Sequence, residues 1–240
     1  MINIEFETRF TLTPTGRIER EADPDRSPGP LMFLAGCDGG NLVQFGHELD
    51  DDLVAELKAL TAEEPPFSRP GEVPLHLERY LDLLSPFGPL RNHPGLSFHL
   101  PHRSQAQVSA PLIASGTAEG DHLQATLTRE GMPPALVEMG FRDAGALWAP
   151  WCLALHDGEI ASLAFAARLG GGGAELGLAT FPAFRGLGLA AAATAGWSAL
   201  PSLADRTLFY STATSNLASQ RVVAKLGLKF IGPTLGISRA

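Results

Sequence analysis

The residues with the clearest chemical meaning lie where a strand-like segment gives way to a helical pattern. Arg185 precedes Gly186 and Gly188, and these glycines alternate with leucines at the start of the helical pattern. The first N–H groups of a helix lack intrahelical acceptors and carry the positive end of the helix dipole, and glycine lets an anion approach the backbone closely. The sequence therefore predicts a phosphate-binding turn.

A dinucleotide is one ligand for such a turn. Gly186, Gly188 and Ala191 match a dinucleotide-binding glycine fingerprint, and Asp205 lies near the distance expected for a ribose-binding acid. However, Asp205 precedes the next predicted strand instead of ending it, and the preceding strands are predicted to be antiparallel. A nucleoside-triphosphate loop fits less well, because neither glycine cluster is followed by Lys and Ser or Thr.

Coenzyme A is the other candidate ligand. The segment Arg185-Gly186-Leu187-Gly188-Leu189-Ala190 fits a Q/R-x-x-G-x-G/A signature, and the segment from Asn216 to Leu228 is similar to an N-x-x-S…K-L-G-F helix. With these two segments, and with its order of predicted elements, the region from Val108 to Ala240 resembles the GNAT superfamily of N-acetyltransferases. The resemblance implies acetyl-CoA as the cofactor.

The resemblance also implies where the cofactor lies. The strands Ala174–Phe181 and Thr207–Thr212 should splay apart, so that backbone groups of the first strand pair with the pantetheine arm, while the glycine turn holds the pyrophosphate. Asn216 and Ser219, three residues apart on one helix face, are expected to bond the pantetheine amide or the phosphates, although a helix N-cap explains Asn216 equally well. The expected cofactor-binding residues are Leu178, Ala179, Thr180, Arg185, Gly186, Leu187, Gly188, Leu189, Ala190, Asn216 and Ser219.

The implied reaction is direct attack of an amine on the thioester, which needs a base for the amine proton and a donor for the leaving thiolate. Glu175, on the strand leading to the glycine turn, is the expected base, with a solvated or salt-bridged strand glutamate as the alternative. The acid in many family members is a tyrosine at a position that Val223 occupies here. Tyr210 is the expected substitute, with packing as its alternative role and Ser219 or water as alternative acids.

The function expected from these residues is acetyl-CoA-dependent N-acetyl transfer to a primary amine of a small molecule or a protein. The alternative is a non-catalytic CoA-binding or regulatory module, which the valine at position 223 favours. The sequence does not identify the acceptor and leaves a homodimer open.

Hydrophobic periodicity predicts the elements that position these residues. Segments 151–156, 160–168 and 174–181 should form an antiparallel meander with turns at 157–158 and 170–173, and segment 186–200 a buried helix. Helices are also expected over 119–129, 134–139 and 216–226, a strand over 207–212, and a final strand or hairpin over 229–238. The fold class is therefore α/β (α+β), a GNAT-like mixed and mainly antiparallel sheet flanked by helices.

An additional N-terminal α/β domain is expected over residues 1–104, followed by the GNAT-like domain over 105–240, with 101–110 as the linker. Within the first domain, Ile2 to Leu12 alternates as a strand would, and 30–37 and 42–45 suggest a strand pair around a turn at 38–41. Segments 50–60 and 75–84 have helical spacing.

Composition narrows the class of partner. The chain has 240 residues, 45% of them hydrophobic, with a net charge of −8 and no long basic run, which argues against nucleic acid as a partner. The charge-free stretch 186–203 is mostly Ala and Gly and contains Pro201, so a buried helix is favoured over a membrane span. The amino-terminal residues lack an export-signal pattern, and a cytoplasmic location is expected.

No metal site is expected. Asp50, Asp51 and Asp52 suit the cap and first turn of a helix, and His93, His99 and His102 do not have a common ligand spacing. Cys37 and Cys152 are expected to be buried free thiols.

Overall fold

The computed structural model describes residues 2–37, 39–104, 109–170 and 172–240. The strands are β1 (Phe10–Leu12), β2 (Ile18–Glu21), β3 (Met32–Cys37), β4 (Gly40–Phe45), β5 (Leu90–His99), β6 (Leu112–Ala114), β7 (Trp151–His156), β8 (Glu159–Leu169), β9 (Gly173–Thr180), β10 (Thr207–Ala213) and β11 (Lys229–Arg239). The helices are α1 (Ile2–Arg9), α2 (Asp51–Ala62), α3 (Leu77–Leu84), α4 (Ala118–Glu130), α5 (Pro134–Glu138), α6 (Leu189–Ser198) and α7 (Leu217–Leu226), with short 3-10 turns η1 (Ser85–Phe87), η2 (Pro182–Phe184) and η3 (Pro201–Leu203). Parts of three predicted features lie outside the described residues: Asp38 of the turn 38–41, residues 105–108 of the linker, and Gly171 of the glycine connection.

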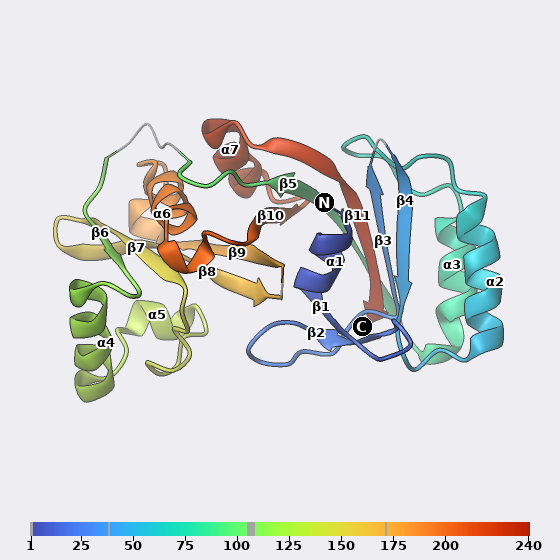
Figure 1. Cartoon of the computed structure of the whole chain (residues 1–240), viewed down its shortest axis with the longest axis horizontal. Helices are drawn as coiled ribbons and strands as arrows, with labels where there is room; N and C mark the ends of the chain where they lie inside the picture. The colour runs from blue at the N-terminus through green and yellow to red at the C-terminus, as the bar shows by residue number, and fades with distance from the viewer. Residues whose placement is uncertain (1, 38, 105–108, 171) are drawn as a thin grey trace.

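A single large sheet organises the molecule (Figure 1). Across the described residues nine strands pair in the order β4-β3-β11-β5-β10-β9-β8-β7-β6, while β1 and β2 form a separate two-stranded sheet. Within the same residues β9 and β10 are the one parallel pair, and the other neighbours are antiparallel. The predicted mixed, mainly antiparallel sheet flanked by helices is confirmed.

The sheet runs across the predicted boundary at 104/105. Strand β5, which precedes that boundary, pairs antiparallel with both β10 and β11, which follow it. Strand β11 in turn pairs with β3. Backbone hydrogen bonds therefore connect the first hundred residues to the rest of the chain, and the division into two domains stays a prediction.

The beginning of the chain differs from the expected strand. Residues Ile2–Arg9 are a helix, and only Phe10–Leu12 are extended, so the prediction of a strand from residue 2 is wrong. The helix places Phe6 one turn before Phe10, and both rings pack on Phe33 of β3, with ring centroids 5.4 and 5.0 Å away. The spacing of apolar residues over 2–12 fits either the two-residue period of a strand or the 3.6-residue period of a helix. Burial of this aromatic cluster favours the helix.

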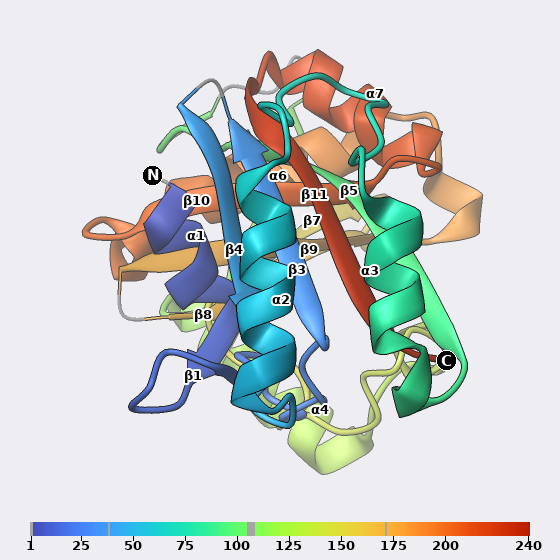
Figure 2. The same cartoon turned by 90° about the vertical axis from the view of Figure 1, so that its right-hand side faces the viewer.

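The helices cover the two faces of the sheet unequally. Residues opposite each other on neighbouring strands point to the same face of the sheet. On one face, α6 and α7 pack against β5, β9 and β10. Farther along the same face, α2 and α3 pack against β3 and β11. Figure 2 shows α2 and α3 side by side across that end of the sheet. The opposite face carries α1 against β3, and α4 and α5 against β7 and β8.

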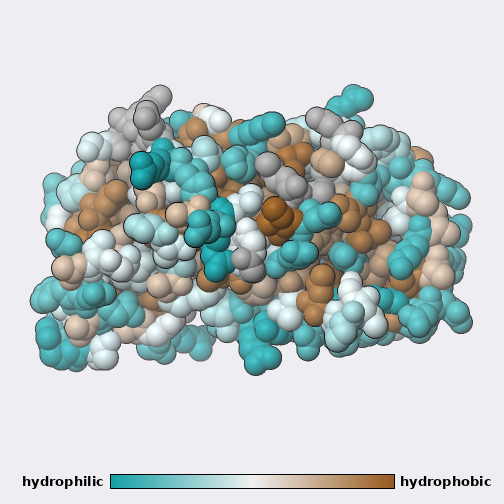
Figure 3. All heavy atoms as spheres, viewed as in Figure 1, coloured by the Kyte–Doolittle hydropathy of each residue, from teal (hydrophilic) through white to brown (hydrophobic). Residues whose placement is uncertain are grey.

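The meander forms as predicted. The apolar helix forms over Leu189–Ser198, and its predicted start at residue 186 is wrong, because Gly186 and Gly188 take positive φ angles in the turn before it. Asp157 and Gly158 join β7 to β8 with positive φ angles of 51° and 83°, the backbone of a tight hairpin turn. Trp197 of α6 is fully buried and donates from Nε1 to the carbonyl of Pro150 at 2.9 Å. Polar and apolar residues are interspersed on the face in Figure 3, and no helix in the described part of the chain is long and apolar enough to cross a membrane.

Asp50 acts as a helix cap, and neither cysteine forms a disulfide. Asp50 caps α2 by accepting a hydrogen bond from the Leu53 N–H at 2.8 Å. The described residues contain no cluster of His, Cys, Asp and Glu that could hold a metal ion. Both cysteines are free, with Cys37 half-buried; Cys152 is buried, which raises the pKa of its thiol to about 12.

Docking of α1 on the β8–β9 connection depends on a glycine. A Cβ on Gly170 would lie 2.3 Å from the Glu7 carbonyl oxygen, whereas a Cβ on Gly172 would meet only the Ile4 side chain at 3.4 Å. We expect Gly170→Ala to lower the free energy of unfolding by about 1–3 kcal/mol because backbone must move. Gly172→Ala is the matched control, and urea unfolding of both variants measures the difference. Equal stabilities would contradict this account of the docking.

Candidate functional site

Strands β9 and β10 diverge in the middle of the sheet. They pair in parallel from Gly173 and Thr207 up to Leu176 and Tyr210, after which no further pair joins them among the described residues. Strand β9 continues to Thr180 and β10 to Ala213, each still paired with its other neighbour. The expected splay is therefore present. Backbone groups of β9 between Leu178 and Thr180 face an opening on the β10 side.

A cavity of about 590 Å³ lies at this opening, on the side of α6 and α7. We name it the cofactor pocket. The predicted cofactor-binding residues that line it are Leu178, Ala179, Thr180, Arg185, Gly186, Gly188, Leu189, Ala190, Asn216 and Ser219. Leu187 is not among the lining residues, and its side chain is 44% exposed. The structure thus brings together ten of the eleven predicted residues.

The glycine turn has the backbone that the sequence predicted. Gly186 and Gly188 have φ angles of +85° and +83°, which side chains disfavour. Gly188 is the N-cap of α6 and offers no side-chain cap, and the buried Leu189 begins the helix. The first N–H groups of α6 therefore keep their hydrogen-bonding capacity for a ligand. An anion in the cofactor pocket would meet them at the positive end of the helix dipole.

Three cationic side chains surround the same pocket. Arg185 of the turn is joined by Arg221 and Lys225, which are four residues apart on α7. Arg221 and Lys225 were not predicted as site residues, although their spacing of one helical turn and their position after Asn216 could have indicated them. In a chain with a net charge of −8, three cations around one pocket favour a polyanionic ligand.

Helix α7 links the pocket to β10. The Asn216 side chain accepts a hydrogen bond from the Ser219 N–H at 3.0 Å, so its N-cap role is present. The Ser219 hydroxyl lies 2.8 Å from the hydroxyl of Tyr210. Val223, at the position of the usual tyrosine, is buried and packs in the core cluster that also contains Tyr210.

Tyr210 stands at the point where the strands diverge. Its side chain is almost fully buried and lines cavities on both sides of the opening. Burial raises the pKa of its hydroxyl, while the bond to Ser219 opposes the rise. The hydroxyl is therefore protonated at neutral pH and can act as a hydrogen-bond donor.

A second cavity, of about 530 Å³, lies on the opposite side of the opening. We name it the acceptor-side pocket. It shares Leu178, Tyr210, Asn216 and Ser219 with the cofactor pocket. Its other lining residues come from both parts of the chain: Arg9, Glu21, Pro30, Phe33, His93, Pro94, Gly95, Ala167, Arg168, Glu175, Leu176, Gly177, Ser211, Thr212, Ala213, Thr234, Gly236 and Ser238. The N-terminal residues in this lining were not selected from the sequence, because no motif marks them.

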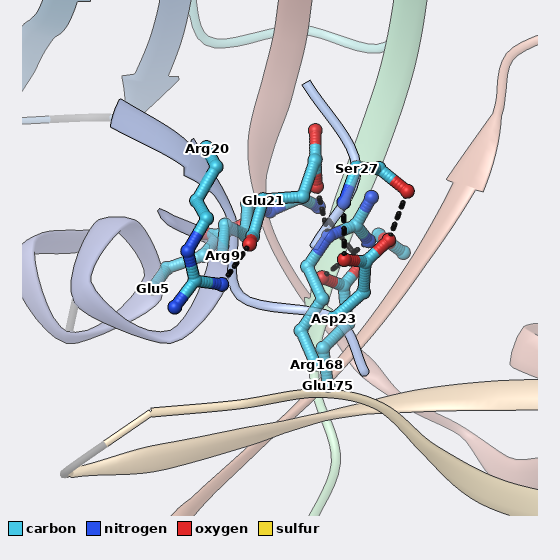
Figure 4. Close-up of polar contacts among 9 residues, drawn as sticks. Glu5, Arg9, Arg20, Glu21, Asp23, Ser27, Arg168 and Glu175 are labelled. Carbon is cyan, nitrogen blue, oxygen red and sulfur yellow. Dashed lines mark hydrogen bonds and ion pairs between the residues drawn. The ribbon is translucent and has the colours of Figure 1, made fainter. Parts of the chain in front are cut away.

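Glu175 lies in the wall of the acceptor-side pocket, within a network of buried and half-buried charges (Figure 4). Its carboxylate accepts a hydrogen bond from Arg168 Nη1 at 2.9 Å and one from the Ser211 hydroxyl. Arg9 Nη2 lies 3.3 Å from its Oε1. Arg168 also pairs with Glu21 of β2, so the network joins segments far apart in the sequence.

These partners determine the ionisation of Glu175. Burial by itself would raise the pKa of the carboxyl, but the charges of Arg168 and Arg9 and the hydrogen bond from Ser211 outweigh it and lower the pKa to about 2. Burial of Glu21 raises the pKa of its carboxyl above the ordinary value, although the positive charge of Arg168 acts to lower it. A carboxylate with a pKa near 2 is a weak proton acceptor at neutral pH. Glu175 is thus a salt-bridged strand glutamate, and its role as a base stays a prediction.

Comparison with known proteins bears on the same region. Residues 119–229 match the family model described as an acetyltransferase (GNAT) domain. This match spans α4 to the start of β11 and includes the glycine turn, Glu175, Tyr210 and α7. The search of curated proteins found no match.

Several solved structures are similar in outline. A GCN5-related N-acetyltransferase-like protein from Streptococcus suis is 17% identical, with a TM-score of 0.46 over 90% of this chain and 86% of that chain. A GNAT-family acetyltransferase from Colwellia psychrerythraea is 17% identical, with a TM-score of 0.44 over 86% and 81%. A Drosophila protein is 14% identical, with a TM-score of 0.48 over 87% and 74%. These similarities are too distant to assign residues or substrates.

The family model thus covers the segment in which both sequence motifs occur and in which the structure places the glycine turn beside diverging strands. Residues 119–229 of this chain belong to the GNAT acetyltransferase family.

Proposed function

We propose that the protein is an acetyl-CoA-dependent N-acetyltransferase that transfers the acetyl group directly to an amine. One observation supports this most: the cofactor pocket and the acceptor-side pocket meet where β9 and β10 diverge, with Leu178 and Tyr210 in both walls. A thioester reaching the opening from one side and an amine from the other would meet without a covalent enzyme intermediate.

The residues of the cofactor pocket suit coenzyme A. The glycine turn and the N-terminus of α6 would hold the pyrophosphate, with Arg185, Arg221 and Lys225 supplying positive charge. From Leu178 to Thr180, β9 has a strand partner on its β8 side but not on its β10 side, and that free side would accept the pantetheine amides as an added strand. When bound, acetyl-CoA supplies the electrophilic thioester carbonyl.

Side chains at the opening would stabilise the leaving group and orient the amine. In the proposed reaction the amine nitrogen attacks the carbonyl, the carbon–sulfur bond breaks and the thiolate leaves. The Tyr210 hydroxyl, which stays protonated, would donate a hydrogen bond to the leaving thiolate. The Ser219 hydroxyl would hold it in position. Glu175 would remain ionised and orient the amine, directly or through water, while the amine proton passes to solvent.

A non-catalytic CoA-binding module remains the second candidate. Two observations favour it: Glu175 is already paired with two guanidinium groups, and a buried valine occupies position 223. The two functions differ in thiol release. Wild-type protein should release free thiol from acetyl-CoA in the presence of some member of a panel of primary amines. Binding of acetyl-CoA without turnover across a broad panel would favour the module.

Cofactor choice can be tested by direct binding. We expect acetyl-CoA, but not NAD, to raise the thermal unfolding midpoint, because ligand that binds only the folded state stabilises it. Arg185→Ala and Arg221→Ala should each weaken acetyl-CoA binding about fivefold by calorimetry, since each removes a charge-assisted contact. Arg129→Ala, an exposed arginine on α4, is the control. Stabilisation by NAD alone would refute the cofactor assignment.

The role of Tyr210 can be separated from binding. Tyr210→Phe keeps the ring in the core but removes the hydroxyl, so kcat should fall by roughly 100-fold. The acetyl-CoA dissociation constant should stay nearly constant. Stopped-flow or steady-state thiol release measures the first quantity and calorimetry the second. An unchanged kcat would assign the donor role to Ser219 or water instead.

The ionisation of Glu175 predicts a pH profile. With its pKa lowered to about 2, the carboxylate is charged throughout the range in which the enzyme can be assayed, so its titration should add no acidic limb to kcat/KM. Glu175→Gln should lower kcat/KM about tenfold at every pH without changing the shape of the curve. An acidic limb present in the wild type and absent in the variant would show that Glu175 is the base.

A further inference from the structure

The divergence of β9 and β10 is bridged by side chains at its starting point. The last backbone pair joins Leu176 to Tyr210. One residue later on β10, the Ser211 hydroxyl donates to Glu175 Oε1 of β9. Ser211 is the first residue of β10 beyond the segment that pairs with β9, and its backbone still pairs with Ser97 of β5. Its side chain therefore links β10 to β9 next to Tyr210, which lines both pockets.

Glu175 is itself held from outside the GNAT segment. Arg9 of α1 lies 3.3 Å from the same Oε1 that accepts the Ser211 hydrogen bond. Arg9 also donates from Nε to Glu5 at 3.1 Å, and Glu5 accepts from the Ser97 hydroxyl of β5 at 2.6 Å. Figure 4 shows Arg9 and Glu5 on α1 near Glu175 and Arg168 of the sheet.

The position of α1 is fixed by contacts other than these charges. Gly170 and Gly173 lie under the helix, where a Cβ would come within 2.3 Å of the Glu7 carbonyl and 2.2 Å of the Thr8 hydroxyl. On its other side Phe6 packs against Phe33. The helix therefore brings Arg9 to Glu175 in a defined geometry.

Burial makes this arrangement sensitive to the loss of one partner. The side chains of Arg9 and Glu175 are 9% and 2% exposed. In such an environment, removing one member of an ion pair leaves the other charge poorly compensated, and the remaining groups rearrange. Without Arg9, the carboxylate would turn toward Arg168, its other guanidinium partner, and away from Ser211.

We propose that Arg9 is a positioning residue for the cofactor: through Glu175 and Ser211 it holds β10 at the start of the opening and so sets the position of the pantetheine end of acetyl-CoA. This inference rests on the proposed function. The N-terminal helix α1, which lies outside the family match, would then contribute to the proposed transfer site.

The test compares two ligands that share the phosphate contacts. Acetyl-CoA carries the pantetheine arm, and 3′-phospho-ADP lacks it. Arg9→Met and Ser211→Ala should each weaken acetyl-CoA binding by about tenfold while 3′-phospho-ADP binding stays within about twofold. Arg9→Lys, which keeps the charge, should recover most of the affinity. Arg129→Met is the matched control, because the ion pair of Arg129 with Glu130 lies on the exposed surface of α4.

The outcomes separate this proposal from the proposed function. Wild-type protein that binds neither ligand would overturn the proposed function, and this inference with it. Unchanged acetyl-CoA affinity in Arg9→Met and Ser211→Ala, with a cofactor-binding wild type, would overturn only the inference. Equal weakening of acetyl-CoA and 3′-phospho-ADP binding would indicate a general disturbance of the fold and would also overturn the inference. Circular dichroism checks folding, and Ser211→Ala decides the matter if Arg9→Met does not fold.

Discussion

The parallel pairing of β9 and β10 stops at Leu176 and Tyr210, and the proposed chemistry depends on that interruption. Two strands that remained paired would leave no free backbone for an added strand and no passage between the faces of the sheet. Each strand keeps its other neighbour, so the opening forms without loss of the sheet. The glycine turn and α7 then follow at the ends of the two strands and form the walls of one pocket.

Charge is distributed differently on the two sides of the opening. The cofactor pocket has an excess of cations, which suits a polyanionic ligand. On the acceptor side, Arg9 and Arg168 are matched by Glu21 and Glu175, so the wall is polar without a large net charge. The overall charge of −8 therefore describes neither pocket, and it gives little guidance about the acceptor.

The first hundred residues take part in the sheet and in the acceptor-side pocket. Strand β5 lies between β10 and β11, and α1 contributes Arg9 to the buried network. A companion domain that packed only at its surface would not share backbone hydrogen bonds in this way. Residues outside the segment that matches the family model thus lie next to the proposed transfer site.

The sequence by itself determined the local features. Positive-φ glycines, the helix caps and the meander follow from short-range preferences, so the turn at Gly186 and Gly188 was predictable from neighbouring residues. Only the tertiary structure decided that α1 is a helix, because Phe6 packs on Phe33 of a later strand. It also decided that Arg9 meets Glu175, because these residues lie more than 160 positions apart in the sequence. It also decided the ionisation of Glu175, since a pKa depends on burial and on which charges the fold brings near.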